Sequence, residues 1–397
     1  MRHLSGAALG GALSIAEHLD TKSRKIEFVD LKAQYARIGE RVSARIQEVL
    51  ESGRYVLGPQ VEELEERLAG FAGVRHAVSV SSGTDALFVA LLARGIGAGD
   101  AVFIPGFTFT ATAEVIVLAG ATPVLVDVDR ASFNICPADL ERRVRQVEAA
   151  GRLRPAAVIA VDLFGAPADY AALGRVSDAR GMFLIADSAQ SFGAMRDNRR
   201  VGSLASVTTT SFYPSKPLGC YGDGGAVFTD DDELAAVLRS VRCHGEGSGA
   251  YDNVRIGVNG RLDAIQAAVL LAKLEIFEDE LARRERVALA YDAALGDAVV
   301  LPQRAAGVAS SWAQYTIRTP HRDGLRRALS DAGIPTMVYY PRPIHMQPAY
   351  SAYGEGPGSL PVSERLCEEV ISLPFHPYLE ERDIETVAMA IRDYVDF

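Results

Sequence analysis

The stretch His76-Ala-Val-Ser-Val-Ser-Ser-Gly-Thr-Asp-Ala-Leu-Phe-Val-Ala-Leu-Leu92 decides the fold. Its opening residues, His76–Val80, form a short apolar run that ends at serines and a glycine, which is typical of a buried strand. The residues from Ser82 to Leu92 form a longer apolar run behind a serine, which favours a capped helix. A buried strand followed directly by a helix is the repeating unit of an α/β fold.

The same alternation continues along the chain on the C-terminal side of this stretch. Further short apolar runs predict strands at Ala101–Pro105, Pro123–Val126, Ala157–Val161, Met182–Ile185, Val207–Ser211 and Gly225–Phe228. Helical spacing between them predicts helices at Ala111–Ala119, Pro137–Ala149 and Tyr170–Arg180. On the N-terminal side, apolar residues from Ile38 to Val49 and a segment that begins at Pro59 also predict helices. Together these elements predict a mostly parallel sheet with helices on both faces.

The pattern changes after Asp263, where strands become fewer. A long helix is expected from there through Leu281 or beyond, followed by strands near Gln314–Arg318 and Thr336–Tyr340. Helices are expected at Asp323–Asp331, Ser363–Val370 and Glu381–Tyr394. We therefore expect a large domain over residues 26–270 and a smaller α+β C-terminal domain over residues 271–397. Residues 1–25 are expected to be a poorly ordered extension rather than a targeting signal.

Composition narrows the range of partners. The chain has 397 residues, a formal net charge of −10 and four cysteines, no two of them in a CxxC pair. The absence of a basic stripe argues against nucleic acid, and the cysteine spacing argues against a structural zinc site or a disulfide framework. No stretch reaches the about 18 apolar residues that suggest a membrane span. These features fit a protein of the reducing cytoplasm.

Lys216 lies in a segment of unusual composition, Ser211-Phe-Tyr-Pro-Ser-Lys-Pro-Leu-Gly-Cys-Tyr-Gly-Asp-Gly-Gly225. Its prolines restrict the backbone and its glycines permit close approach. A lysine that acts as a nucleophile must be held in place and partly desolvated, which such a segment allows. A surface loop with a solvated lysine is an equally good interpretation of this segment alone.

Asp187 changes that balance, because it ends the apolar run Met182-Phe-Leu-Ile-Ala-Asp187. An acid at the carboxyl end of a parallel strand lies where open α/β sheets bind ligands. Pyridoxal 5′-phosphate (PLP) needs a carboxylate beside its ring nitrogen and a lysine that holds it as a Schiff base. The competing interpretation of Asp187 is an ordinary helix N-cap.

Two further segments follow predicted strands. Gly83, in Ser81-Ser-Gly-Thr84, opens a helix whose backbone N–H groups suit a phosphate, although an ordinary capped helix start has the same pattern. Phe109, in Pro105-Gly-Phe-Thr-Phe-Thr-Ala-Thr112, could stack on a cofactor ring, although most aromatic residues at strand ends belong to the core.

In this order, the motifs SGT, PxFTFxAT, ADSAQSFGA, SFYPSK and GDGGA resemble the DegT/DnrJ/EryC1/StrS family of sugar-nucleotide aminotransferases. The resemblance extends from about Ile26 to the C-terminus. It implies PLP as cofactor and a fold of PLP-dependent transferase type I, similar to aspartate aminotransferase. Some family members carry histidine in place of this lysine and act as dehydratases. Because this chain has Lys216 at that position, the resemblance implies transamination.

The resemblance also implies individual roles. Lys216 would form the internal aldimine, Asp187 would pair with the pyridine nitrogen, and Gln190 would lie near the ring hydroxyl. Phe109 would stack on the ring. The remaining roles concern the phosphate, which would be bound by Gly83, Thr84, Ser211 and, from the neighbouring subunit, Asn259. This last contact implies a homodimer with shared active sites.

Several stretches, among them Tyr55–Pro59, Val254–Asn259 and Leu373–Tyr378, resemble a subgroup that acts on UDP-2-acetamido-2-deoxy-3-oxo-D-glucuronate. This subgroup makes amino sugars for bacterial surface polysaccharides such as the O-antigen of lipopolysaccharide. The resemblance implies L-glutamate as donor.

In this subgroup Arg261 would bind the sugar carboxylate, and His345 would be a further sugar contact. For Arg261, a structural ion pair with Asp263 or another acid remains open. For His345, a purely structural role remains open. The Gly/Ser-rich segment 244–251 departs from the subgroup, so amination at C4 of a 4-keto-6-deoxy sugar nucleotide remains an alternative. A non-catalytic PLP-binding regulator is another.

Overall fold

The structure is a computed structural model that describes residues 25–249 and 251–395. The expectation of a poorly ordered extension therefore falls almost entirely outside the described residues. A seven-stranded sheet with the order β1-β9-β8-β5-β4-β2-β3 forms the centre of the molecule. Its strands are β1 (His76–Val80), β2 (Asp100–Pro105), β3 (Thr122–Val126), β4 (Arg154–Val161), β5 (Phe183–Asp187), β8 (Val207–Ser211) and β9 (Gly225–Thr229). Only β9 runs antiparallel to its neighbours β1 and β8, which confirms the predicted fold class.

Helices cover both faces of this sheet because the strand residues alternate between two cores. In β4, Ala157 and Ile159 pack on one side, while Val158 and Ala160 pack on the other. The first side carries α3 (Gly83–Ala93), α4 (Ala111–Leu118) and α7 (Asp232–Val241). The opposite side carries α1 (Leu31–Ser52), α2 (Pro59–Ala72), α5 (Pro137–Ala150), α6 (Tyr170–Asp178) and α8 (Ala264–Leu274). The central part of the molecule therefore has three layers, with the sheet between two layers of helices.

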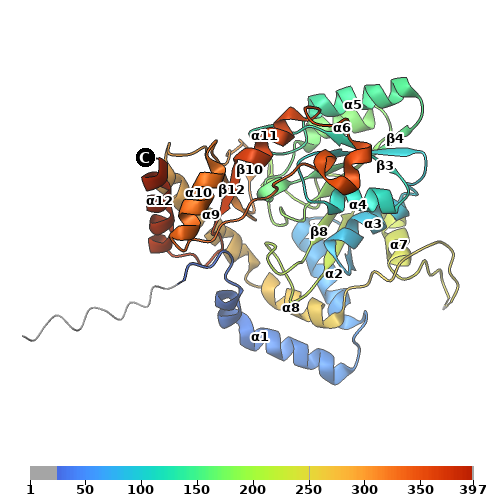
Figure 1. Ribbon diagram of the computed structural model, residues 1–397. Coiled ribbons are helices and arrows are strands. Elements are labelled where there is room, and N and C mark those ends of the chain that lie inside the picture. Colours follow the sequence, from blue (N-terminus) through green and yellow to red (C-terminus); the bar gives the residue numbers. More distant parts are fainter. Residues whose placement is uncertain (1–24, 250, 396–397) are drawn as a thin grey trace, which may run out of the picture.

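A separate core lies in the C-terminal part of the chain. It is built from α9 (Phe277–Leu295), β11 (Tyr315–Arg318), α10 (Arg322–Asp331), β12 (Val370–Leu373) and α12 (Glu381–Val395). Strands β11 and β12 pair antiparallel, and Tyr291 stacks on Tyr315 between them and α9. Figure 1 shows α10 and α12 gathered to one side of the central sheet, away from α5 and α6.

Two expectations about this C-terminal part were wrong. The expected long helix after Asp263 is interrupted at Glu275 and Ile276, so that α8 packs in the core of the large sheet and α9 in the C-terminal core. The expected strand Thr336–Tyr340 is reduced to a single bridge between Met337 and Ser372. Prolines on either side of this segment cannot donate to a ladder, which explains why it does not extend.

The remaining elements are short. They are β6 (Met195–Arg196), β7 (Arg199–Arg200), β10 (Val308–Ala309), α11 (Pro361–Glu369) and the single-turn helices η1 (Leu163–Gly165), η2 (Ile344–Met346) and η3 (Pro348–Tyr353). Among the described residues, no helix is long and apolar enough to span a membrane.

Candidate active site

The candidate site lies at the carboxyl edge of the sheet, where Asp187 ends β5 and Ser211 ends the adjacent strand β8. Gly225 pairs with both Ser211 and Val80, so the segment after β1 reaches the same place. Open α/β sheets bind ligands at this edge. The fold thus brings together the segments that carry Gly83, Asp187 and Lys216, although they are far apart in the sequence.

Asp187 and Lys216 lie within electrostatic reach of each other. Burial raises the pKa of the Asp187 carboxyl, while the backbone N–H of Ala189, the Lys216 charge and the Thr112 hydroxyl oppose this rise. Burial also lowers the pKa of the Lys216 amine, against the attraction of Asp187. Desolvation therefore favours the neutral, nucleophilic form of this amine.

The segment that carries Lys216 forms a closed turn. The Cys220 backbone N–H donates to the Phe212 carbonyl at 2.7 Å, and the Lys216 N–H donates to the Tyr213 carbonyl at 2.8 Å. A Cβ atom at Gly219 would lie 2.6 Å from the Tyr213 carbonyl oxygen, so only glycine fits there. This turn fixes where the Lys216 side chain begins.

Gly83, the first residue of α3, lies directly against Ser211. A Cβ atom at Gly83 would come within 2.5 Å of the Ser211 Cβ atom. Ser82 caps the helix by accepting from the Asp85 N–H at 3.0 Å. A helix N-terminus with a glycine and serine hydroxyls can bind a phosphate, and Thr84 lies in the same turn. This cradle and the Asp187–Lys216 pair fit the phosphate and the ring of PLP.

Gln190 and Phe109 meet at Tyr340, which sequence reasoning missed. The Gln190 side-chain oxygen accepts from the Phe164 N–H at 2.6 Å, and its amide nitrogen donates to the Tyr340 hydroxyl at 3.3 Å. The ring of Phe109, which is 53% exposed, lies 6.0 Å from the ring of Tyr340. The sequence signal was the pair Tyr339-Tyr340 at the end of an expected strand.

Asp162, at the end of the strand next to Asp187, was also missed. Its carboxylate accepts from the Tyr170 hydroxyl at 2.6 Å, the Ser191 hydroxyl at 2.6 Å and the Ala168 N–H at 2.8 Å. Its own N–H donates to the Asp187 carbonyl at 3.0 Å. Burial raises the pKa of Asp162 to about 7. An acid directly after the strand Ala157–Val161 was the available signal.

Asn259 and Arg261 flank Gly260, whose carbonyl accepts from the Ser81 N–H at 3.0 Å. This bond links both residues to the segment that precedes Gly83. Asn259 is exposed, while the Arg261 Nε atom is buried without a hydrogen-bond partner in the described part of the chain.

His345 lies in a different environment. Only 2% of it is exposed, and its Nε2 atom lies 2.9 Å from a carboxylate oxygen of Glu364. Its Nδ1 atom is buried without a hydrogen-bond partner in the described part of the chain. The contact with Glu364 is typical of a structural histidine, and the role of His345 as a sugar contact stays a prediction.

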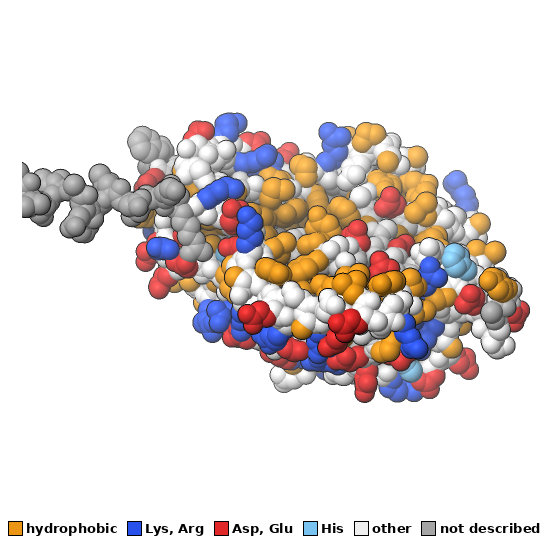
Figure 2. Space-filling view, turned by 90° about the horizontal axis from the view of Figure 1, so that it is seen from below, with side chains coloured by type: hydrophobic (Ala, Val, Ile, Leu, Met, Phe, Trp, Pro, Cys, Tyr) orange, Lys and Arg blue, Asp and Glu red, His pale blue; other side chains and the backbone are white. Residues whose placement is uncertain are grey.

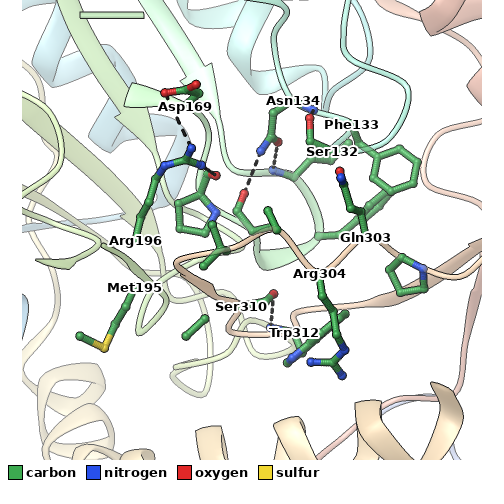
Figure 3. Close-up of a pocket in the computed structure, with 18 of the residues that line it drawn as sticks. Ser132, Phe133, Asn134, Asp169, Met195, Arg196, Gln303, Arg304, Ser310 and Trp312 are labelled. Carbon is green, nitrogen blue, oxygen red and sulfur yellow. Dashed lines mark hydrogen bonds and ion pairs between the residues drawn. The ribbon is translucent and has the colours of Figure 1, made fainter. Parts of the chain in front are cut away.

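A cavity of about 640 Å³ between the large sheet and the C-terminal core is not this site. Figure 3 shows Phe133 and Trp312 among its walls, and Arg304 beside Trp312. The Arg304 guanidinium lies 4.8 Å from the Trp312 ring and is paired with Glu285 at 2.6 Å. Neither Asp187 nor Lys216 lines this cavity.

No group of three or more histidine, cysteine, aspartate or glutamate side chains within residues 25–249 and 251–395 could hold a metal ion.

Comparison with known proteins shows the family to which the chain belongs. A sequence profile of the DegT/DnrJ/EryC1/StrS aminotransferase family matches residues 36–392. A relative from Pseudomonas aeruginosa, named UDP-2-acetamido-2-deoxy-3-oxo-D-glucuronate aminotransferase, is 46% identical, with 92% of this chain and 99% of the relative covered. A Streptomyces venezuelae relative, named dTDP-3-amino-3,4,6-trideoxy-alpha-D-glucose transaminase, is 39% identical, with 94% of this chain and 97% of the relative covered.

The fold is likewise similar to solved structures. The crystal structure of a DegT DnrJ EryC1 StrS aminotransferase from Brucella abortus has a TM-score of 0.91 and 52% identity. The alignment covers 93% of this chain and 99% of that one.

Proposed function

Because this chain belongs to the DegT/DnrJ/EryC1/StrS aminotransferase family, we propose that it binds PLP at Lys216 and moves an amino group from L-glutamate to a keto sugar nucleotide. The observation that carries the proposal is the half-buried Lys216 amine within electrostatic reach of the buried Asp187 carboxyl, beside the Gly83–Ser211 cradle. A sheet edge with only a capped helix would need neither this acid nor this amine.

Each residue of the site has a separate task in this proposal. When bound, PLP supplies a ring that accepts electrons from the carbon next to the transferred amine. Asp187 holds positive charge at the ring nitrogen, and Gln190 binds beside the ring hydroxyl. Gly83, Thr84 and Ser211 would bind the phosphate, and Phe109 would cover the ring. Lys216 carries the proton on its Nζ atom, since an amine of lowered pKa can act as base and acid.

The proposed acceptor is UDP-2-acetamido-2-deoxy-3-oxo-D-glucuronate, supported by the Pseudomonas aeruginosa relative. The chemistry of Arg261 supports a carboxylate on the sugar, because its buried Nε atom lacks a partner in the described chain. A planar guanidinium suits a two-point contact with a carboxylate. Both relatives described above carry names with the nitrogen or oxo group at C3, which favours C3 over C4.

We further propose a homodimer in which Asn259 of one protomer reaches the phosphate of the other. Large hydrophobic side chains are exposed close to the site, among them Tyr35, Tyr55, Tyr213 and Tyr221. Figure 2, seen from below the view of Figure 1, shows hydrophobic side chains gathered in a band across the side of the molecule on which α1 lies. Exposed apolar patches of this kind mark association surfaces.

The test is the Lys216→Ala variant. Without the amine that holds the cofactor and moves the proton, turnover of the keto sugar should fall by about a thousandfold or more. Full turnover by this variant without an added amine would refute the proposal. In the wild-type protein, L-glutamate should bleach the visible absorption of the lysine-bound cofactor, and a spectrum that no amino donor changes would favour a PLP-binding regulator.

A further inference from the structure

A buried lysine that takes no part in the proposed chemistry lies beneath the Lys216 turn. Lys273 is near the end of α8, a helix whose other residues are apolar except Gln266, and is only 1% exposed. It belongs to the largest fully buried side chains of the described protein. Because an ammonium loses its hydration on burial, a lysine at such a position needs contacts that compensate for the loss.

Those contacts lead to the segment that follows Lys216. The Lys273 Nζ atom donates to the Gly219 carbonyl at 2.6 Å. The same atom lies 4.3 Å from the centre of the Tyr221 ring, within the range of a cation–π interaction. Burial lowers the pKa of Lys273 to about 8, while the charge of Glu280 opposes this change.

The Gly219 carbonyl is part of the turn that sets the start of the Lys216 side chain. Gly219 is three positions beyond Lys216, and the turn closes with the 2.7 Å bond from Cys220 to Phe212. There is no spare room at Gly219, where an added Cβ atom would collide with two carbonyl oxygens at 2.6 Å. A rotation of the Gly219 peptide would therefore move the backbone on the Lys216 side of the turn.

We propose that Lys273 is a positioning residue for Lys216, which holds the Gly219 carbonyl so that the reactive amine stays directed at the cofactor site. The inference rests on the proposed function of Lys216. It differs from a lysine that merely stabilises the core, because its effect is on the geometry of the turn rather than on the stability of the whole fold.

The experiment compares two buried cations. Lys273→Met removes the donor and keeps much of the side-chain volume. Arg284→Met is the matched control, since Arg284 is 5% exposed and donates to a backbone carbonyl, that of Trp312 at 2.9 Å, outside the Lys216 turn. Hydrogen exchange of residues 212–221 is measured in the cofactor-free proteins, and the pH titration of the visible band and its bleaching by L-glutamate are measured after PLP is added.

Lys273→Met should speed amide exchange in residues 212–221 by about tenfold. It should also shift the band titration and slow bleaching by about tenfold or more, as a small displacement of a reacting group costs rate. Arg284→Met should change neither the band titration nor the bleaching, and any faster exchange from lost stability should be shared by the slow amides of the whole protein rather than confined to residues 212–221. The proposal would be overturned if Lys273→Met kept the amide exchange and the band titration of the wild type. It would also be overturned if both variants changed these readouts equally.

If Lys273→Met does not fold, Lys273→Gln tests the same proposal. The glutamine side chain is one atom too short to place its donor where the Lys273 Nζ atom lies. The readouts also separate this inference from the proposed function. Wild-type protein that never forms the lysine-bound band would sink the function of Lys216, while exchange in the cofactor-free protein would still test Lys273.

Discussion

The proposed cofactor side and the proposed sugar side of the candidate site are built in different ways. Asp187 and Ser211 are the last residues of adjacent strands, and Gly83 begins a helix at the same edge, so the sheet fixes all three. On the proposed sugar side, Arg261 and the segments 244–249 and 251–256 belong to irregular chain, where Tyr251 is 94% exposed and Ile256 is 87% exposed. The sheet can thus keep one chemistry constant while the exposed segments adapt to different sugars.

After the loss of Lys216, the largest expected effect tests the proposed cofactor side. Asp187→Asn keeps the shape of the side chain but cannot balance positive charge at the ring nitrogen, so both half-reactions should slow by about a hundredfold to a thousandfold. The control is Asp127→Asn, a buried acid after β3 that accepts from the Ser363 hydroxyl at 2.7 Å, away from Lys216. Stopped-flow bleaching by L-glutamate compares the half-reaction with the donor in the two variants. Equal losses in the two variants would mean that only the fold had been damaged.

The same difference explains what could be predicted from the sequence. Lys216, Asp187 and Gly83 stood out because strand ends and glycine-rich turns have local signatures, and the seven central strands have their own apolar runs. Tyr340 and Asp162 were missed because their importance depends on distant partners, Gln190 and Tyr170. The break between α8 and α9 escaped for the same reason, since it depends on which core each helix joins.

On the sugar side, Arg261→Ala tests whether this arginine binds a carboxylate. Loss of a charge-assisted hydrogen bond costs about 1.5–3 kcal/mol, so use of a uronic-acid sugar nucleotide should fall by about tenfold to a hundredfold. A matched sugar without the carboxylate should be used almost as before, and so should L-glutamate.

An Arg261 that only braces the dimer predicts another pattern. Both sugars would then lose activity alike, and sedimentation would show a weaker dimer. Equal losses would remove the carboxylate role and leave the uronic-acid substrate resting on the relative alone.

A smaller effect concerns the stability that Asp162, next to the proposed cofactor side, contributes to the fold. With its pKa raised to about 7 in the folded chain, Asp162 adds stability as the neutral acid below pH ~4, and this contribution is lost as the pH rises towards 7. In Asp162→Asn this pH dependence should disappear. The difference in free energy of unfolding between wild type and variant should therefore fall by on the order of 2–3 kcal/mol between pH 5 and pH 7.5. Urea unfolding of the cofactor-free proteins measures it, and a constant difference would contradict the raised pKa.

The smallest expected effect decides to which side Tyr340 belongs. Its hydroxyl accepts from Gln190, while its ring lies against Phe109, and both partners are on the cofactor side. Tyr340→Phe removes one hydrogen bond of about 0.5–1.5 kcal/mol and keeps the ring, so both half-reactions should slow alike by about twofold to tenfold. Tyr291→Phe is the control, because its hydroxyl donates to the Pro374 carbonyl within the C-terminal core. If only the reaction with the keto sugar slowed, Tyr340 would act on the sugar, and the boundary between the two sides would run through the Gln190–Tyr340 bond.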